Sequence, residues 1–257
     1  MKTGSENNDP LPKQFLDYLG GILHGDFGPS YKYTGKEVTD FIKNGFPVSA
    51  KVGGITILFV VLASIPMGIL AAVKNGKWQD MVVMAIATIG VTIPSFVIAS
   101  VLIYIFSFKL NWLPTYGLDS WKGYILPVIT LGGYSVSYLA RQMRSSLLEV
   151  MGQDYIRTAR AKGLSETKVI FKHALRNAMI PVITVLGPTI ANLLTGSFVV
   201  EQIFAIPGLG VHFVNSVSQR DYTTIMGVTV FYATFLLAMV FIVDIFYCLI
   251  DPRIKYE

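Results

Sequence analysis

Apolar residues are gathered in long blocks along this chain. Each block is about 18 residues or longer, and at roughly 1.5 Å rise per residue such a helix crosses a hydrocarbon core of roughly 30 Å. Five such runs in succession are rare in a soluble core, so the pattern predicts an all-α polytopic membrane protein with five transmembrane helices. The five runs, none of which contains Asp, Glu, Lys or Arg, cover residues 52–73, 81–108, 123–140, 177–200 and 222–243.

Composition supports this interpretation. Hydrophobic residues make up 53% of the chain and charged residues only 14%, against roughly 25% charged in ordinary soluble domains. The net charge of +5 would suggest nucleic acid in a soluble protein. Here the basic residues cluster at the ends of apolar runs, where they set membrane orientation.

Basic residues define the inside of the membrane, because short loops rich in Lys and Arg stay in the cytoplasm. The segment 141–176 is the most basic part of the chain, and residues 74–80 are basic as well. We therefore expect both segments, and the tail 251–257, on the cytoplasmic side. The loops 109–122 and 201–221 then lie outside.

Five spans and a cytoplasmic tail place residues 1–50 outside, although this segment is charged and has no signal peptide. We expect that a sixth, N-terminal transmembrane helix is missing from the chain; a true N-out protein is the alternative. The amphipathic stretches 12–24 and 37–46 predict short helices at the outer surface, joined by the turn-rich GDFGPSY.

Several classes of function lack their signature. The sequence contains no phosphate-binding loop, no nucleophile elbow and no zinc-protease motif. Its single cysteine, Cys248, and its scattered histidines predict no disulfide and no metal site. Among the apolar segments only Asp244 adds an ionisable group near a helix end, whereas ion-driven transporters place such groups near the midplane. We therefore expect no enzyme activity in this chain, and a driving energy that arrives through a loop.

The basic segment Arg157–Arg176 predicts two short helices. Asp154 is an expected N-cap for a helix over 155–162, and Gly163 suits the left-handed position after its end. Ser165 would cap a second helix that runs to Pro181. A solvated loop would explain the charge, and a lipid-headgroup patch would explain charge and amphipathicity. Docking into a groove of a cytoplasmic partner explains both, together with the Ala-Gly pattern.

This segment resembles the coupling motif E-A-A-x-x-x-G of importer permeases of the ATP-binding cassette (ABC) superfamily. Gly163 and Ala159 match, whereas Arg157 and Thr158 replace the Glu and the first Ala. The departures are similar to the oligopeptide and dipeptide branch, whose B-type subunit has one more N-terminal helix. The same branch is indicated, in the right order, by GDFGPSY at 25–31, NWLPTYG at 111–117, ILPVITLG at 125–132, VVEQIFAIPGLG at 199–210 and DPR at 251–253.

The resemblance implies a permease of a prokaryotic cytoplasmic membrane. It would work with a second, similar permease, two cytoplasmic ATPases that bind ATP and Mg²⁺, and an extracytoplasmic solute-binding protein that delivers the peptide. The helix 155–162 would insert into a cleft of one ATPase, with Ala159 on the inserted face. The expected coupling residues are Asp154, Tyr155, Arg157, Thr158, Ala159, Gly163 and Leu164.

Two further groups of residues are candidates. A polar stripe in the run 177–200 predicts either helix packing or a lining for the translocation path; its members are Thr189, Asn192, Thr195 and Gly196. The loop 201–221 would face the binding protein, or would be an ordinary outer loop. The expected contacts there are Glu201, Pro207, Gly208 and Gly210.

The expected organisation is an extracytoplasmic segment 1–50, a transmembrane domain 51–250 and a cytoplasmic tail. The domain includes the coupling loop 146–176 and the outer loop 201–221. The leading functional hypothesis is the permease of an ATP-driven importer for oligopeptides or dipeptides. A permease for nickel or a metallophore, and a membrane protein that binds lipid without transport, are the alternatives.

Overall fold

The computed structural model describes the backbone of residues 10–250, and the side chains of these residues except 244 and 246–250. Apart from an isolated bridge between Pro29 and Glu37, its elements are helical. The predicted tail 251–257 and the side chains of Asp244 and Cys248 lie outside the described residues. The elements in chain order are α1 (Leu11–Leu23), α2 (Val38–Val73), α3 (Trp78–Thr92), α4 (Ser95–Leu102), the π-helical η1 (Ile103–Lys109), α5 (Trp121–Met151), α6 (Asp154–Ala161), α7 (Glu166–Lys168), the π-helical η2 (Val169–Ala174), α8 (Leu175–Leu194), α9 (Phe198–Ile203), α10 (Leu209–Gln219) and α11 (Tyr222–Ile250).

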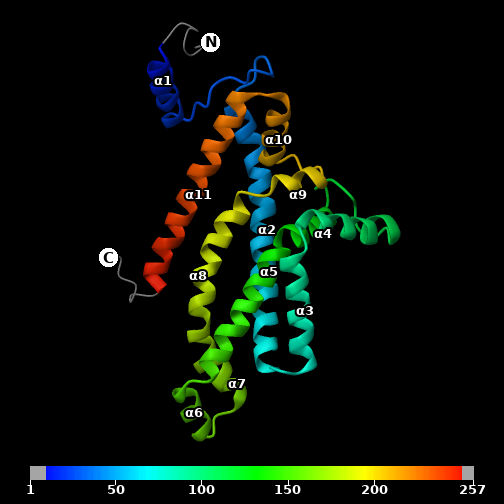
Figure 1. The fold of residues 1–257 in the computed structure, drawn as a ribbon, viewed down its shortest axis with the longest axis vertical. Helices are drawn as coiled ribbons and strands as arrows, with labels where there is room; N and C mark the ends of the chain where they lie inside the picture. Colours follow the sequence, from blue (N-terminus) through cyan, green and yellow to red (C-terminus); the bar gives the residue numbers. More distant parts are fainter. Residues whose placement is uncertain (1–9, 251–257) are drawn as a thin grey trace.

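The centre of the molecule is made by α2, α5 and α8, with α3 against α5 and α11 against α8 and α2 (Figure 1). Glycines allow the close crossings. A Cβ atom added to Gly68 of α2 would lie 2.5 Å from the Met143 Cβ of α5, and one added to Gly53 would collide with the Leu193 carbonyl of α8. Small residues at helix crossings are typical of membrane bundles, where the backbones must approach for packing to stabilise them.

Four helices are long and apolar enough to cross a membrane, and a fifth span results if one bent helix pair counts as one. The predicted all-α polytopic fold is therefore confirmed. The fourth predicted span has different ends. The run 177–200 stops at Leu194, and the helix that carries it begins at Glu166 and continues through Pro181. The second helix of the basic segment is thus the start of this span and is not a separate short helix.

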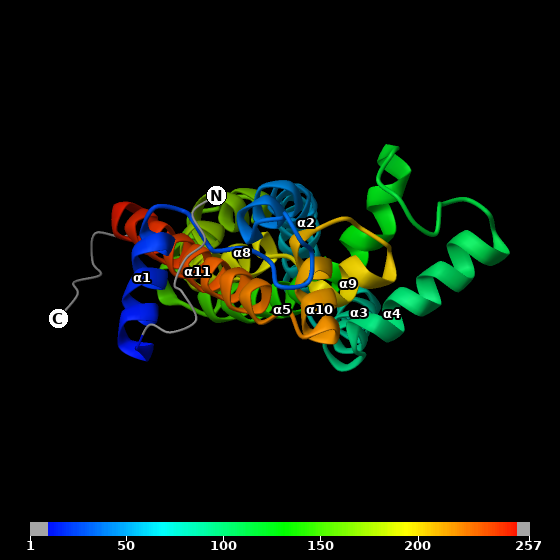
Figure 2. The ribbon, with the colours of Figure 1, turned by 90° about the horizontal axis from the view of Figure 1, so that it is seen from above.

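The run 81–108 is not one straight helix, contrary to the prediction. It bends by 112° between α3 and α4, so that α4 projects sideways from the bundle (Figure 2). The bend lies at Ile93 and Pro94. Proline has no N–H to continue the helix, and it favours an extended conformation in the residue before it, which Ile93 adopts (φ −84°, ψ 127°).

The stretch 37–46 was predicted to form its own surface helix, and this was wrong. It is the first part of α2, which has 36 residues and runs through Pro47 and Pro66. At 1.5 Å per residue its length is about 54 Å, more than a hydrocarbon core requires, so one end extends beyond the bilayer. The predicted helix over 12–24 is confirmed as α1.

The motif GDFGPSY is anchored to the turn before α11. Ser30 Oγ donates a hydrogen bond to Asp221 Oδ2, and the Tyr31 N–H donates to Asp221 Oδ1 at 3.2 Å. The same carboxylate accepts hydrogen bonds from the hydroxyl and N–H of Thr224, in the first turn of α11. Burial alone would raise the pKa of Asp221, but these hydrogen bonds lower it below its usual value. The motif is thereby held against the bundle.

Candidate functional site

The helix expected to couple to a partner is α6, which lies at the end of the bundle that also holds the turn between α2 and α3 (Figure 1). Its position is close to the prediction, but its cap differs. Gln153 occupies the N-cap without a side-chain hydrogen bond, and Asp154 is the first helical residue. A carboxylate in the first turn still interacts favourably with the helix dipole. Gly163 follows the helix with φ +76°, the predicted left-handed conformation.

The apolar face of α6 is turned toward the chain itself. Ile156 is fully buried and Ala159 is 7% exposed, in a cluster with Met143 and Leu147 of α5 and Val169 of η2. The expectation that Ala159 enters a partner's cleft is therefore corrected. This side chain anchors α6 to the base of α5. Packing within the chain removes the apolar face of α6 from water, which stabilises the fold without a partner.

The surface of α6 that remains free is polar. Asp154, Arg157 and Thr158 are exposed, Tyr155 is 43% exposed, and Leu164 is half-buried. The Tyr155 hydroxyl accepts a hydrogen bond of 2.8 Å from Asn177 Nδ2. Of the seven predicted coupling residues, the structure therefore presents most on the surface and buries Ala159.

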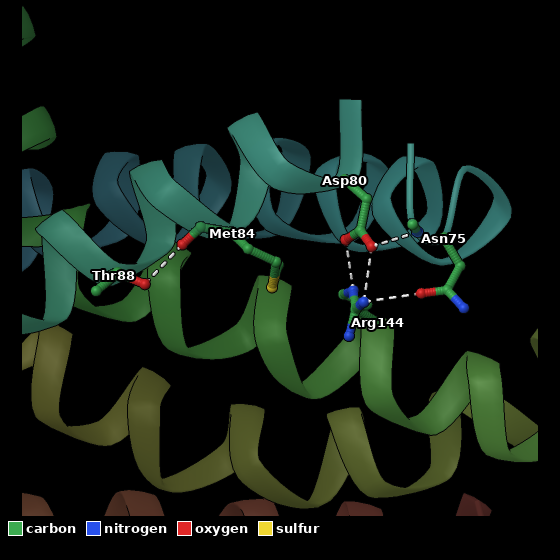
Figure 3. Close-up of polar contacts among 6 residues, drawn as sticks. Asn75, Asp80, Met84, Thr88 and Arg144 are labelled. Atoms are coloured by element: carbon green, nitrogen blue, oxygen red, sulfur yellow. Dashed lines mark hydrogen bonds and ion pairs between the residues drawn. The ribbon is translucent and has the colours of Figure 1, made fainter. Parts of the chain in front are cut away.

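A bidentate ion pair holds the turn between α2 and α3 to the base of α5 (Figure 3). Arg144 Nε lies 2.6 Å from Asp80 Oδ1, and Arg144 Nη2 donates to Asp80 Oδ2 at 2.7 Å and to Asn75 Oδ1 at 2.9 Å. The Gly76 N–H donates to Asp80 Oδ2 at 2.9 Å. Asp80 is buried, and its lost hydration is replaced by three directed contacts, two from Arg144 and one from the Gly76 N–H.

Sequence reasoning missed this ion pair, because 64 positions separate its members. The available signal was weak: opposite charges in two segments that were both predicted to lie inside. Arg144 belongs to α5 a few residues before the α6 anchor at Leu147. The ion pair thus joins the α2–α3 turn to the same helix end that carries α6.

Of the four residues of the predicted polar stripe, two line a cavity and two do not. Thr195 and Gly196 line a cavity of about 400 Å³ together with Phe213 and Tyr232. The Thr189 hydroxyl donates to the Val185 carbonyl of its own helix. Asn192 is exposed on the outside of this chain.

The loop 201–221, predicted to lie outside, is built around a buried carboxylate. Glu201 is 3% exposed, and Gly208 and Gly210 are buried beside it, whereas Pro207 is exposed. Of the four residues predicted to contact a binding protein, the structure leaves only Pro207 on the surface of this chain. A Cβ atom added to Gly208 would collide with the Glu201 carboxylate, and one added to Gly210 would lie 2.8 Å from it.

The Glu201 carboxylate joins three elements. Its Oε1 accepts a hydrogen bond of 2.7 Å from Ser49 Oγ on α2. Its Oε2 accepts hydrogen bonds from the N–H groups of Gly210, at 2.8 Å, and Val211, at 3.3 Å, in the first turn of α10. These N–H groups have no partner within their own helix. Burial raises the pKa of Glu201, and the hydrogen bonds offset this only in part.

Within residues 10–250, no group of three His, Cys, Asp or Glu side chains is arranged to hold a metal ion.

Comparison with known proteins identifies the family of this chain. Residues 64–256 match the family described as "Binding-protein-dependent transport system inner membrane component". The chain is 48% identical over 248 residues to the dipeptide transport system permease protein DppB of Bacillus subtilis, covering 96% of this chain and 80% of that protein. It is 45% identical over 255 residues to the oligopeptide transport system permease protein OppB of Haemophilus influenzae, covering 97% and 82%.

Solved structures agree on the fold. The methionine ABC transporter MetNI in an inward-facing conformation superposes with a TM-score of 0.69 at 19% identity, covering 82% of this chain and 96% of that one. An amino acid ABC transporter crystallised with histidines gives a TM-score of 0.55 at 16% identity, covering 91% and 96%.

Proposed function

Because the chain belongs to the family of binding-protein-dependent transport system inner membrane components, we propose that it is the permease subunit of an ATP-driven importer for oligopeptides or dipeptides. The observation that carries this proposal is its 48% identity, over nearly its full length, to a dipeptide permease. The bundle with four or five apolar spans provides the membrane-crossing structure.

The driving energy enters through partners. We assign ATP and Mg²⁺ to two cytoplasmic ATPase subunits, since this sequence has no phosphate-binding loop. A second, similar permease completes the translocation path, and an extracytoplasmic binding protein delivers the peptide. The exposed face of α6, with Tyr155, Arg157 and Thr158, is the surface for one ATPase. Because Ile156 and Ala159 fix α6 to α5 and η2, a displacement of α6 would move those helices with it.

The proposed orientation places α6 and the α2–α3 turn in the cytoplasm of a prokaryotic cell, with the outer loop and α10 on the opposite side. The Asp80–Arg144 ion pair supports it, since it joins two segments that charge alone assigns to the inside. The same rule places the C-terminal tail inside. Cysteines introduced at Lys77 and Lys162, with Cys248 replaced, are expected to react with impermeant reagents only from the cytoplasmic side, and those at Asp119 and Asn215 only from outside.

The test of function is uptake by reconstituted liposomes that contain this chain with its partner permease, ATPases and binding protein. We expect ATP-dependent accumulation of labelled dipeptides or oligopeptides, and none when the binding protein is omitted. Accumulation of nickel or a nickel chelate without peptide uptake would replace the proposed substrate. The absence of any ATP-dependent uptake would reject the proposed function.

A further inference from the structure

A cavity of about 420 Å³ lies in the elbow between α3 and α4. Its walls are the bend itself, residues 90–95, with Thr130 and Tyr134 of α5 and Ser197 and Val200 at α9. Its volume is in the range of small-molecule sites. None of its lining side chains carries a charge.

The cavity exists because α3 and α5 touch and then diverge. At Gly90 the two helices are so close that an added Cβ atom would collide with the Ser137 hydroxyl. Immediately after this contact, α3 ends at Thr92 and the chain turns by 112° into α4. The space left by the turn faces Thr130 and Tyr134, which lie farther from the cytoplasmic end of α5 than Ser137.

The bend releases backbone groups from their helical partners. Pro94 has no N–H for the Gly90 carbonyl, and the Val97 and Ile98 N–H groups donate to the Pro94 carbonyl. Because α3 ends at Thr92, the carbonyls of Val91 and Thr92 accept no hydrogen bond from a following turn of that helix. At membrane depth, such backbone is tolerated where protein buries it or where it lines a polar cavity.

A buried hydroxyl in the same cavity also lacks a partner. Thr130 is 2% exposed, and its Oγ1 makes no hydrogen bond within the described residues. The hydroxyls of Ser95 and Tyr134 likewise make none in that part of the chain. A buried hydroxyl without a partner costs roughly 1–3 kcal/mol, and a rotation of the Thr130 side chain would turn this hydroxyl toward a partner that enters the cavity.

Free carbonyls and free hydroxyls on an uncharged wall match one chemical class. An extended peptide main chain presents N–H groups, which the carbonyls of residues 90–92 would accept, and carbonyls, to which Thr130 and Ser95 would donate. The absence of charge in the lining disfavours the ammonium and carboxylate ends of a peptide, which would have to be desolvated there without a counter-ion. Recognition through the main chain would not depend on side-chain identity.

We infer that the α3–α4 elbow is a transit site of the permease that binds the interior main chain of a translocating oligopeptide through the carbonyls of residues 90–92 and the hydroxyls of Thr130 and Ser95. The inference rests on the proposed function, because it takes the peptide as substrate. It adds a location and a mode of recognition that is independent of peptide sequence.

The first test is uptake by the reconstituted transporter with Thr130→Val or Ser95→Ala. Each variant removes one hydroxyl, and we expect a fall of about two- to tenfold in the maximal uptake rate. The half-saturating peptide concentration should not change, because the binding protein captures the peptide first. The Thr130→Val variant should unfold at the same temperature as the parent or a higher one, since it removes an unsatisfied polar group, so a fall in uptake cannot be attributed to misfolding.

Ser100→Ala is the matched control. Ser100 is also on α4, but its hydroxyl already donates to the Phe96 carbonyl at 2.9 Å and does not line the cavity. Its uptake should equal that of the parent. Parental rates in both Thr130→Val and Ser95→Ala, in a transporter that imports peptides, would overturn the site and leave the proposed function intact.

The second test measures occupancy directly. Ile98 also lines the cavity. In a transporter with Ile98→Cys, and with Cys248 replaced by Ser, we expect N-acetyl-trialanine amide to slow alkylation by N-ethylmaleimide. An analogue with ester links in place of amides should protect less, and Thr130→Val should abolish protection. Equal alkylation rates with and without the blocked peptide would overturn the site. A parental transporter that imports no peptide at all would reject the proposed function, and the transit site with it.

Discussion

The loop around α6 (the α6 loop) and the loop from Gly196 to Gly210 (the Glu201 loop) look alike in sequence, since both are glycine-containing turns with charged residues beside a membrane span. Their structures treat charge in opposite ways. The α6 loop keeps its charges at the surface, where the Arg160–Glu166 pair spans the turn at Gly163 with 2.8 Å between Nε and Oε1. The Glu201 loop buries its carboxylate and arranges three elements around it.

This difference separates two uses of glycine. At Gly163 the backbone needs a left-handed conformation, while a Cβ atom would meet nothing within 4 Å. At Gly208 the backbone is extended (φ −91°), and the constraint is the Glu201 carboxylate that lies against it. A partner can therefore approach the α6 loop, whereas much of the Glu201 loop is occupied by contacts within the chain.

Glu201→Ala is expected to have the largest effect, because it leaves Ser49 and two N–H groups of α10 without their acceptor. We expect a loss of about 4 kcal/mol in the free energy of unfolding, measured by thermal unfolding of the detergent-purified transporter. An alanine variant that unfolds at the parental temperature would show that the Glu201 loop is not held by this carboxylate.

The pH dependence of stability tests the direction of the Glu201 pKa shift. Because the pKa of Glu201 is raised in the folded protein, its contribution to stability is fully present below its unfolded pKa and is lost as pH rises through the folded value. Glu201→Gln cannot titrate. As pH rises through that window, the unfolding temperature of the parent should therefore fall relative to that of Glu201→Gln. A constant difference would contradict the raised pKa.

Arg144→Ala tests whether the end of the bundle that carries α6 depends on its buried ion pair. Asp80 would remain buried without its counter-ion, at a cost of about 3 kcal/mol in the free energy of unfolding. Asp80→Ala in the same chain should recover part of this loss, because the unpaired charge is gone. If the double variant is less stable than Arg144→Ala by the full effect of Asp80→Ala, the two side chains do not interact.

Gly208→Ala should cost about 2 kcal/mol in the free energy of unfolding, because its methyl group displaces the carboxylate. Gly54→Ala on α2 is the matched control, since a Cβ atom there meets nothing within 4 Å. It should be neutral or stabilising by up to about 1 kcal/mol, the difference in helix propensity. Equal losses at both positions would mean that close packing around Glu201 is not the constraint.

Gly163→Leu is expected to have the smallest effect on folding, about 1 kcal/mol, from the left-handed backbone alone. Its larger consequence is for energy transfer, since a redirected turn moves the exposed face of α6. Uptake should fall together with the ATPase activity that loaded binding protein stimulates. Gly163→Asn, which tolerates this backbone conformation, should retain more of both, and Lys168→Ala should change neither. Normal uptake by Gly163→Leu would remove the coupling role.

The sequence by itself determined the helical membrane class, the basic loop and the positions of α1 and α6. These follow from local properties: the length of apolar runs, the clustering of charge and the conformational freedom of glycine. The sequence shows Pro94, but it does not predict that the chain turns by 112° there. Whether a helix continues through a proline depends on the neighbouring helices. Pro47, Pro66, Pro181 and Pro188 all lie inside continuous helices.

Tertiary structure alone decided which polar groups meet. Asp80 and Arg144, and Ser49 and Glu201, are far apart in the sequence, and no periodicity relates them. It also decided that Ala159 faces the bundle and that Thr130 faces a cavity, since a helical pattern fixes which residues share a face but not what that face contacts. The physical reason is that burial and hydrogen bonding are satisfied between elements, and the folded arrangement of those elements is what brings the partners together.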